Sequence, residues 1–162
     1  MQIREATPAD WPQVYPFFAS TVEAGETYAY PDHLTSDEAR ALWMAPAPDR
    51  CVVAVDDDGT VLGSAKYGPN RPARGSHVGT ASFMVSPAAR GRGVGRALGE
   101  HVVDALRDEG YAAIQFNAVV ETNTVAVRLW HDLGFTIVGT VPEAYEHRTL
   151  GRVGLHVMHR HL

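Results

Sequence analysis

The sequence predicts an α/β fold of the α+β type, in which helices cover both faces of one mixed β-sheet. The first observation behind this prediction is the order of the expected elements, β-α-α-β-β-β-α-β-α-β, which implies a mixed sheet. The second is size, because 162 residues with 45% hydrophobic content are enough to bury one core. We therefore expect a single domain over residues 1–162.

The N-terminal segment is expected to hold a short strand at residues 2–4 and two helices. Residues 7–10, Thr-Pro-Ala-Asp, have the pattern of an N-cap, a first helical proline and an acid in the first turn. The helix that follows should bury Trp11, Val14 and Phe18. A second capping box at residues 35–38 predicts another helix, which ends before Pro46.

The segment between these helices, residues 23–34, is expected to be a loop. Its two tyrosines, Tyr28 and Tyr30, do not fall on a periodic apolar face. Loops of this kind often face ligands, so Tyr28 is a candidate for substrate binding.

The middle of the chain is rich in strand-forming sequence. Residues 51–55 and 60–67 flank an Asp-Asp-Asp-Gly turn, which predicts a hairpin. An insert at 68–75 separates this hairpin from a further strand at 77–85. In the C-terminal half, the patterns predict a helix from Val94 to Gly110. The elements expected after it are a strand at 112–119, a helix at 124–133, and strands near 135–141 and 153–160.

The turn from strand 77–85 into the next helix carries the clearest functional signal. Gly91, Gly93 and Gly95 remove Cβ atoms where the backbone can close around a ligand, and the N–H groups of a helix start can bind an anion. The charges beside them are those of Arg90, Arg92 and Arg96. Two neighbouring phosphates would suit this cradle, and the alternative is a helix cap with solvated arginines.

Two common phosphate motifs do not fit this loop. A Walker loop needs Gly-Lys followed by Ser or Thr, and the dinucleotide fingerprint needs a small residue where Arg96 stands. A second motif lies downstream, Asn123-x-x-Ala126-x-x-Leu129-Trp130-x-x-x-Gly134-Phe135. Together with Arg90-x-x-Gly93-x-Gly95, it resembles the GCN5-related N-acetyltransferase (GNAT) family at every spacing.

The resemblance implies a fold, a reaction and a set of binding residues. The fold would be a mostly antiparallel central sheet of six to seven strands, and the reaction would move acetyl from acetyl-CoA, a co-substrate, to an amine. Val85 would pair with the pantetheine arm, Asn123 would touch it, and the backbone near Phe83 and Met84 would donate to the thioester oxygen. The remaining cofactor-binding candidates are Gly91, Arg92, Gly93, Val94, Gly95 and Arg96 for the pyrophosphate, with Arg90, Ala126 and Trp130 beside them.

The chain departs from the family pattern at two points. Trp130 stands where many members have a tyrosine that protonates the leaving thiolate, and an indole N–H is no acid at neutral pH. Tyr145 and His147, expected in a loop after Pro142, could replace it, and so could water. Strand 79–85 also lacks the carboxylate that some members use as a base, for which Glu121 and His77 are the candidates.

Asn117 is the most suggestive residue for the acceptor. It interrupts an apolar strand, where a buried amide must find partners from a ligand or from a neighbouring loop. Residues 116–123, with Tyr28 and the loop that begins at Tyr67, look similar to the branch that acetylates small amino acids, of the azetidine-2-carboxylate and phosphinothricin type. Asn117 is therefore a catalytic and a substrate-binding candidate, and Tyr67 a substrate-binding candidate.

Composition narrows the partners. The formal net charge of −5 disfavours a nucleic-acid surface, and no apolar run predicts a membrane span. The single cysteine, Cys51, can form no internal disulfide, and we expect a cytoplasmic protein. No metal site is expected, because strand spacing puts His159 and His161 together but His156 on the opposite face. Apolar C-terminal strands suggest a homodimer, and the alternative to an enzyme is a non-catalytic acyl-CoA-binding module.

Overall fold

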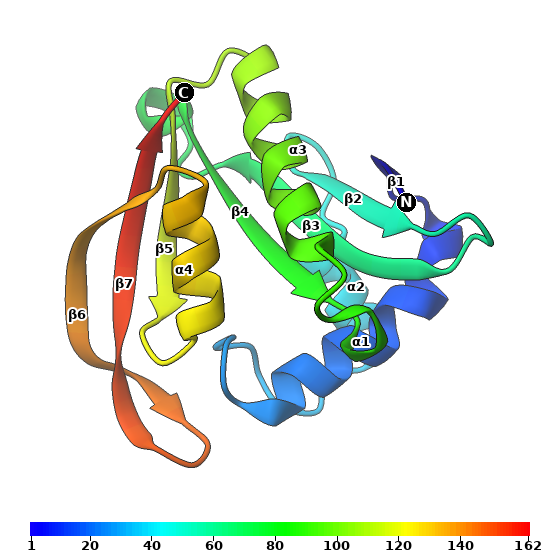
Figure 1. Cartoon of the computed structure of the whole chain (residues 1–162), viewed down its shortest axis with the longest axis horizontal. Helices are drawn as coiled ribbons and strands as arrows, with labels where there is room; N and C mark the ends of the chain where they lie inside the picture. Colours follow the sequence, from blue (N-terminus) through cyan, green and yellow to red (C-terminus); the bar gives the residue numbers. More distant parts are fainter.

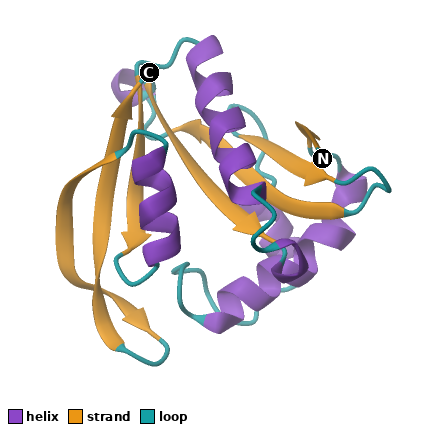
Figure 2. Cartoon of the chain, viewed as in Figure 1, coloured by secondary structure: helices purple, strands orange, loops and turns teal.

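The computed structural model describes residues 1–162, which form one seven-stranded sheet of order β1-β2-β3-β4-β5-β7-β6 (Figure 1). Every pair of neighbouring strands is antiparallel except β4 and β5, which are parallel. Helices lie on both faces of the sheet, as Figure 2 shows in purple. The predicted mixed, mostly antiparallel sheet with helices on both faces is therefore confirmed.

The N-terminal half of the sheet follows the sequence prediction closely. Its strands are β1 (Gln2–Glu5), β2 (Arg50–Val55), β3 (Val61–Pro69) and β4 (Val78–Val85). The predicted hairpin is β2 and β3, and Gly59 supplies the positive φ of +85° that its turn requires.

Two helices cover one face of these strands. A 3₁₀ turn at Pro8–Asp10 leads into α1 (Trp11–Ala24), and α2 (Ser36–Trp43) begins after the N-cap Thr35. The Thr35 hydroxyl accepts the Glu38 N–H at 3.3 Å, as the capping box predicts. At the start of α1, Arg4 donates to both carboxylate oxygens of Asp10, at 2.8 and 2.7 Å.

The C-terminal half holds the remaining elements, which are α3 (Val94–Asp108), β5 (Ala113–Val120), α4 (Thr124–Asp132), β6 (Thr136–His147) and β7 (Gly151–His161). The predicted end of the sixth strand near residue 141 is wrong. Strand β6 continues through an irregularity between Val141 and Tyr145, and such a bulge accommodates Pro142. Tyr145 and His147 thus belong to a strand and not to a loop.

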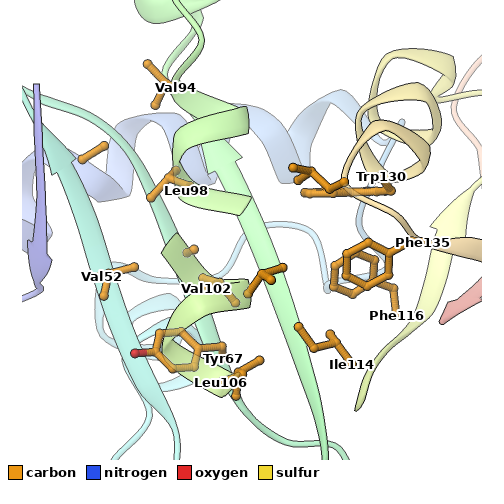
Figure 3. Close-up of a cluster of buried hydrophobic side chains, with 14 of the residues drawn as sticks. Val52, Tyr67, Val94, Leu98, Val102, Leu106, Ile114, Phe116, Trp130 and Phe135 are labelled. Atoms are coloured by element: carbon orange, nitrogen blue, oxygen red, sulfur yellow. The ribbon is translucent and has the colours of Figure 1, made fainter. Parts of the chain in front are cut away.

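The core is divided by the sheet into two layers. Val52 and Ala54 point to the face covered by α3 and α4, whereas Val53 and Val55 point to α1 and α2. Figure 3 shows the first layer, with Val94, Leu98, Val102 and Leu106 along α3. Trp11, Val14 and Phe18 are buried in the second layer, as predicted.

Candidate functional site

The sheet opens between its two parallel strands. β4 and β5 pair only where Val78 meets Ala113 and Gly79 meets Ile114, so the rest of β4 has no strand neighbour on that side. The Ser86 N–H donates to the Leu62 carbonyl just beyond the paired residues, at 2.9 Å, so the main-chain groups of even-numbered residues in β4 bond to β3. Phe83 and Val85, at odd positions, therefore direct their main-chain N–H and C=O groups away from β3 into this opening.

One side chain already occupies part of the open edge. The Tyr28 hydroxyl donates to the Phe83 carbonyl at 2.7 Å and accepts the Phe83 N–H at 2.9 Å. Burial raises the pKa of Tyr28 well above its ordinary value, so the phenol is neutral at physiological pH. The Tyr145 hydroxyl in turn donates to the Tyr28 carbonyl at 3.3 Å. Tyr28 thus joins β4 to β6 across the opening, and the Val85 groups form the remaining open edge.

The glycine-rich loop at the end of β4 has the geometry of an anion site. Gly91 and Gly93 have φ values of +76° and +78°, and a Cβ on either would meet no atom within 4 Å. The first intrahelical bond of α3 runs from the Ala97 N–H to the Gly93 carbonyl, and no side chain caps the helix. The N–H groups of residues 93–96 are therefore open to a ligand, and a pyrophosphate fits them.

The three arginines of this loop are not equivalent. Arg92 pairs with Asp56 at 2.6 Å and Arg96 pairs with Asp132 at 2.7 Å, whereas exposed Arg90 makes no ion pair. Of the three predicted positive charges, two are therefore balanced by a carboxylate of the chain itself. Either guanidinium must exchange a carboxylate for a phosphate if it is to contact the ligand.

Helix α4 contributes the other wall of the opening. The Asn123 side-chain oxygen caps the helix by accepting the Ala126 N–H at 3.3 Å, as predicted, and leaves its amide N–H groups available. Trp130 is 7% exposed, and its ring lies 4.7 Å from that of Phe83 and 4.9 Å from that of Phe116. Figure 3 shows Trp130 beside Phe116 and Phe135. The aromatic cluster of Phe83, Phe116, Trp130 and Phe135 therefore connects β4, β5 and α4.

The two candidates for the missing acid are held in structural contacts. Tyr145 is 6% exposed, and burial raises its pKa, which opposes release of its proton. The His147 Nδ1 accepts the N–H groups of Thr149 and Leu150 at 3.2 and 3.3 Å in the turn between β6 and β7. This ring nitrogen stabilises the turn as an acceptor, so only Nε2 of His147 could donate a proton.

The two candidates for the base differ in position. His77 precedes the far end of β4, about 20 Å of extended strand away from Phe83, which removes it from the site. Glu121 follows the end of β5, and its Oε1 accepts the Gly154 N–H at 2.5 Å while the residue stays exposed. Its second oxygen, Oε2, also lies against Gly154, so Glu121 can reach the opening only if its side chain turns away from β7.

The predicted substrate residues Asn117 and Tyr67 differ in burial. Asn117 is exposed and not buried, because its side chain lies on the face of β5 away from the core; it donates to the Asn70 side chain at 2.6 Å. Tyr67 is a core residue, 5% exposed beneath α3, so its assignment as a substrate contact is wrong. Alternation explains the error, because Tyr67 lies on the α3 face of β3, whereas the neighbouring Lys66 lies on the face of α1 and α2.

Two groups near Tyr28 were not among the predicted site residues. The Thr27 hydroxyl oxygen is buried without a hydrogen-bond partner, which is unusual for a polar atom. Lys66 donates to the Leu42 carbonyl at 2.8 Å and lies over the Tyr30 and Trp43 rings at 5.6 and 5.7 Å, with no carboxylate partner. It is the only lysine of the chain, a signal that the sequence did offer.

The structure gives little support for a metal site, a membrane span or a reactive cysteine. His159 and His161 lie side by side with ring centroids 4.8 Å apart, as their spacing predicts, and no cluster of three potential metal ligands is present. None of the helices has both the length and the apolar character needed to cross a bilayer. Cys51 is half-buried, and burial raises the pKa of its thiol.

An open strand edge that ends in a helix start with free N–H groups is the arrangement expected of an acyl-CoA-dependent transferase. The Acetyltransferase (GNAT) family model matches residues 10–135, and the chain belongs to this family. The predicted resemblance and the predicted enzyme class, an acetyl-CoA-dependent N-acetyltransferase, are confirmed.

Three relatives give this assignment detail. A GCN5-related N-acetyltransferase from Kribbella flavida superposes with a TM-score of 0.96 at 63% identity, over 99% of this chain and 97% of that one. A Salmonella typhimurium acetyltransferase solved with acetyl-CoA has a TM-score of 0.83 at 27% identity, over 100% and 94% of the two chains. The L-methionine sulfoximine/L-methionine sulfone acetyltransferase of Pseudomonas aeruginosa is 32% identical over 147 residues, 87% of this chain and 83% of that protein.

Proposed function

We propose that this protein transfers acetyl from acetyl-CoA to the amine of a small molecule, an amino acid or an amino-acid analogue. The observation that carries the proposal is the continuity of the open β4 edge with the anion site. Val85 presents strand-like hydrogen-bonding groups, and the uncapped N–H groups of α3 begin at Gly93. A donor with an extended amide arm and a pyrophosphate matches this series of groups. The P. aeruginosa relative, which is named for amino-acid analogues, supports the acceptor class.

The donor side is proposed to bind mostly through the main chain. Acetyl-CoA supplies the acetyl thioester, the bond that is broken in the transfer. Val85 would pair with the pantetheine amides as a strand neighbour does, and residues 91–96, with the free N–H groups of 93–96, would hold the pyrophosphate. Arg90 would add charge, and the Asn123 amide would donate to the arm. Ala126 is small enough for the arm to lie against α4.

The proton route is proposed to depend on Glu121 and water. The attacking amine must lose a proton, and the Glu121 oxygen that does not accept the Gly154 N–H can take it directly or through a water molecule. Tyr145 is less suited to the role of acid predicted for it, because burial raises its pKa and its hydroxyl is bonded to Tyr28. Water would then protonate the CoA thiolate, consistent with the absence of a tyrosine at Trp130.

The acceptor is proposed to bind on the α1–α2 side of β4. The unpaired Thr27 hydroxyl lies next to Tyr28, and a ligand could supply its missing partner. The ammonium group of Lys66 has no carboxylate partner in the chain and could pair with the carboxylate of an amino acid. Asn117, held by its bond to Asn70, would close the acceptor site from the opposite side of the opening.

The proposal is tested by measuring CoA thiol release from acetyl-CoA with a panel of matched acceptors. Each amino acid is paired with the amine that lacks its carboxylate, so that the contribution of the carboxylate is measured directly. We expect a preference for the amino acid of each pair, and we expect Lys66→Met to reduce this preference while acetyl-CoA affinity stays constant. Tight binding of acetyl-CoA with no transfer to any acceptor would instead identify a non-catalytic acyl-CoA-binding module.

We also propose a homodimer in the cytoplasm, with the whole chain acting as one catalytic domain. The edge strand β6 exposes Val138 and Val141 at 69% and 52%, which could bury apolar surface against a second copy. Val153 contributes less than the sequence suggested, because it is 9% exposed within its own chain. Sedimentation at micromolar concentration tests the dimer, and a monomer there would remove it without affecting the proposed reaction. The half-buried single cysteine is compatible with a reducing compartment, which fractionation tests.

A further inference from the structure

Tyr28 makes an unusual contact for a side chain in a loop between two helices. Its single hydroxyl oxygen lies 2.9 Å from the Phe83 nitrogen and 2.7 Å from the Phe83 oxygen. It therefore satisfies both main-chain groups that a neighbouring strand would otherwise bond. No other side chain of the chain bonds the open edge of β4 in this way.

The contact lies where the acyl group of the donor has to pass. Phe83 is two residues before Val85 on the same edge, a distance of about 7 Å along the strand. In the proposed binding mode, a pantetheine arm that starts at the α3 N-terminus and pairs with Val85 would bring its thioester carbonyl to the Phe83 N–H. One N–H makes one strong hydrogen bond, so the thioester oxygen and the Tyr28 hydroxyl compete for it.

We propose that, in the absence of donor, the Tyr28 hydroxyl occupies the position at Phe83 that the acyl oxygen of acetyl-CoA takes when it binds. Acetyl-CoA displaces the hydroxyl, and the hydroxyl returns when the transfer has left CoA in the site. The inference rests on the proposed function in that acetyl-CoA is the ligand of the β4 edge. CoA has no acyl oxygen, so after transfer nothing competes with Tyr28 for Phe83. The tyrosine thereby favours product release and keeps the thioester-polarising N–H occupied while no donor is bound.

The contacts of Tyr28 define what such a movement would change. Tyr28 lies outside regular secondary structure, and the Tyr30 ring stacks on it at a centroid distance of 5.4 Å. The Tyr145 hydroxyl bonds its carbonyl and not its side chain, so the side chain can turn while this bond persists. The present arrangement also leaves the adjacent Thr27 hydroxyl buried without a partner, so a different loop conformation could gain a hydrogen bond.

The competition predicts opposite results for the two forms of the cofactor. Tyr28→Phe removes the hydroxyl and frees the Phe83 N–H, so acetyl-CoA should bind about three- to tenfold more tightly, the size of one net hydrogen bond. CoA should bind within twofold of the unmodified protein. Tyr30→Phe is the matched control, because Tyr30 stacks beside Tyr28 but makes no bond to β4, and it should change neither affinity. Titration calorimetry with acetyl-CoA and with CoA measures all six values.

Equal or weaker binding of acetyl-CoA by Tyr28→Phe would overturn the proposal, and so would an equal gain for both ligands. A kcat lowered at unchanged affinity would also overturn it and would place the hydroxyl in the chemical step. Calorimetry needs no acceptor, so these results stand apart from the outcome of the transfer assay.

A measurement on the unmodified protein removes dependence on the stability of the variant. In ¹⁵N and tyrosine ¹³Cζ NMR spectra, acetyl-CoA should shift both the Phe83 amide and the Tyr28 ring carbon, whereas CoA should leave the Tyr28 signal in place. Unchanged Tyr28 signals with saturating acetyl-CoA would contradict displacement.

Discussion

The two sides of the β4 edge are built from different parts of the polypeptide. The proposed donor side consists of main-chain groups, the open edge at Val85 and the uncapped N–H groups of residues 93–96. The acceptor side consists of side chains from distant segments, with Tyr28 from the α1–α2 loop and Tyr145 from β6 joined by one hydrogen bond. Main-chain groups are independent of residue identity, so the donor side can stay constant within a family while the acceptor side varies.

The two halves of the sheet, β1–β4 and β5–β7, differ in how deeply their strands are buried. Strands β2 and β3 are buried between helices on both faces, whereas β6 is exposed along most of its length. The halves share only two backbone register positions, between β4 and β5. Side-chain contacts across the opening must therefore hold the two halves together.

The largest effect is expected where an aromatic side chain joins the two halves. Trp130→Ala removes the ring that packs on Phe83 of β4 and Phe116 of β5, and should lower the free energy of unfolding by about 3–5 kcal/mol. Trp130→Phe keeps most of the contact and should cost much less. Because the indole donates no proton, Trp130→Phe should also keep kcat within about threefold. Urea unfolding measures the first effect, and a cost below ~1 kcal/mol would show that the cluster does not hold the halves together.

A stability change confined to the N-terminal half should leave the site intact. Asp10→Asn weakens the paired hydrogen bonds from Arg4, which are the main cause of the lowered pKa of Asp10, and should cost about 1.5–3 kcal/mol. The folded-state pKa lies below the unfolded value of ~3.9, so this stabilisation is complete at neutral pH and is lost as the pH falls below about 4.

Urea unfolding between pH 3 and pH 7 tests this prediction. The difference between Asp10→Asn and the unmodified protein should shrink toward acid pH, and a difference independent of pH would contradict the charge-based explanation. The KM for acetyl-CoA at neutral pH should not change.

The donor side alone should respond to a side chain in the phosphate loop. Gly93→Val places a branched side chain at φ +78° in the space claimed by the pyrophosphate, and should raise the KM for acetyl-CoA at least about tenfold. Gly110→Val is the matched control, because Gly110 has φ +84° and equally open surroundings but lies at the other end of α3. Comparable losses of thermal stability with a KM change only in Gly93→Val are expected, and equal KM values would refute the cradle.

The acceptor side alone should respond to Asn117. Asn117→Ala breaks the bond to Asn70, and should lower kcat/KM for the amine about ten- to a hundredfold if the amide also bonds the acceptor. Asn70→Ala breaks the same internal bond and gives the structural part of the effect. Steady-state kinetics with each substrate varied separates the two, and identical losses in the two variants would make Asn117 a loop anchor only.

The donor side was predictable from sequence because local chemistry defines it. Gly91 and Gly93 adopt positive φ values within one loop, and Asn123 caps a helix whose Ala126 N–H is three residues away. Each of these features depends only on residues that are close in the sequence. The element order predicted the sheet for the same reason, since period and turn chemistry are local properties.

The acceptor side was not predictable because it depends on long-range pairing. Nothing near Tyr28 in the sequence indicates that its hydroxyl meets Phe83, or that Tyr145 lies in a strand beside it. Asn117 was expected to be buried because its neighbours are apolar, but only the packing of α4 on one face of β5 decides which side of that strand is covered. Tyr67 was misassigned for a related reason. Side chains alternate between the two faces of β3, and the sequence does not show which helices cover each face.

The smallest expected effect concerns the charge of the donor side. Asp56 holds Arg92 at 2.6 Å, and Asp56→Asn would release this arginine toward the pyrophosphate. Because exposed ion pairs contribute little, the KM for acetyl-CoA should fall only about two- to threefold at low salt, and the gain should vanish above the ionic strength at which such charges are screened. Asp104→Asn changes the net charge equally and releases Arg107, which is remote from the loop, so it should leave KM unchanged. A rise in KM for Asp56→Asn would mean that the carboxylate positions Arg92 for the phosphate, and the donor side would then depend on a side-chain pair as the acceptor side does.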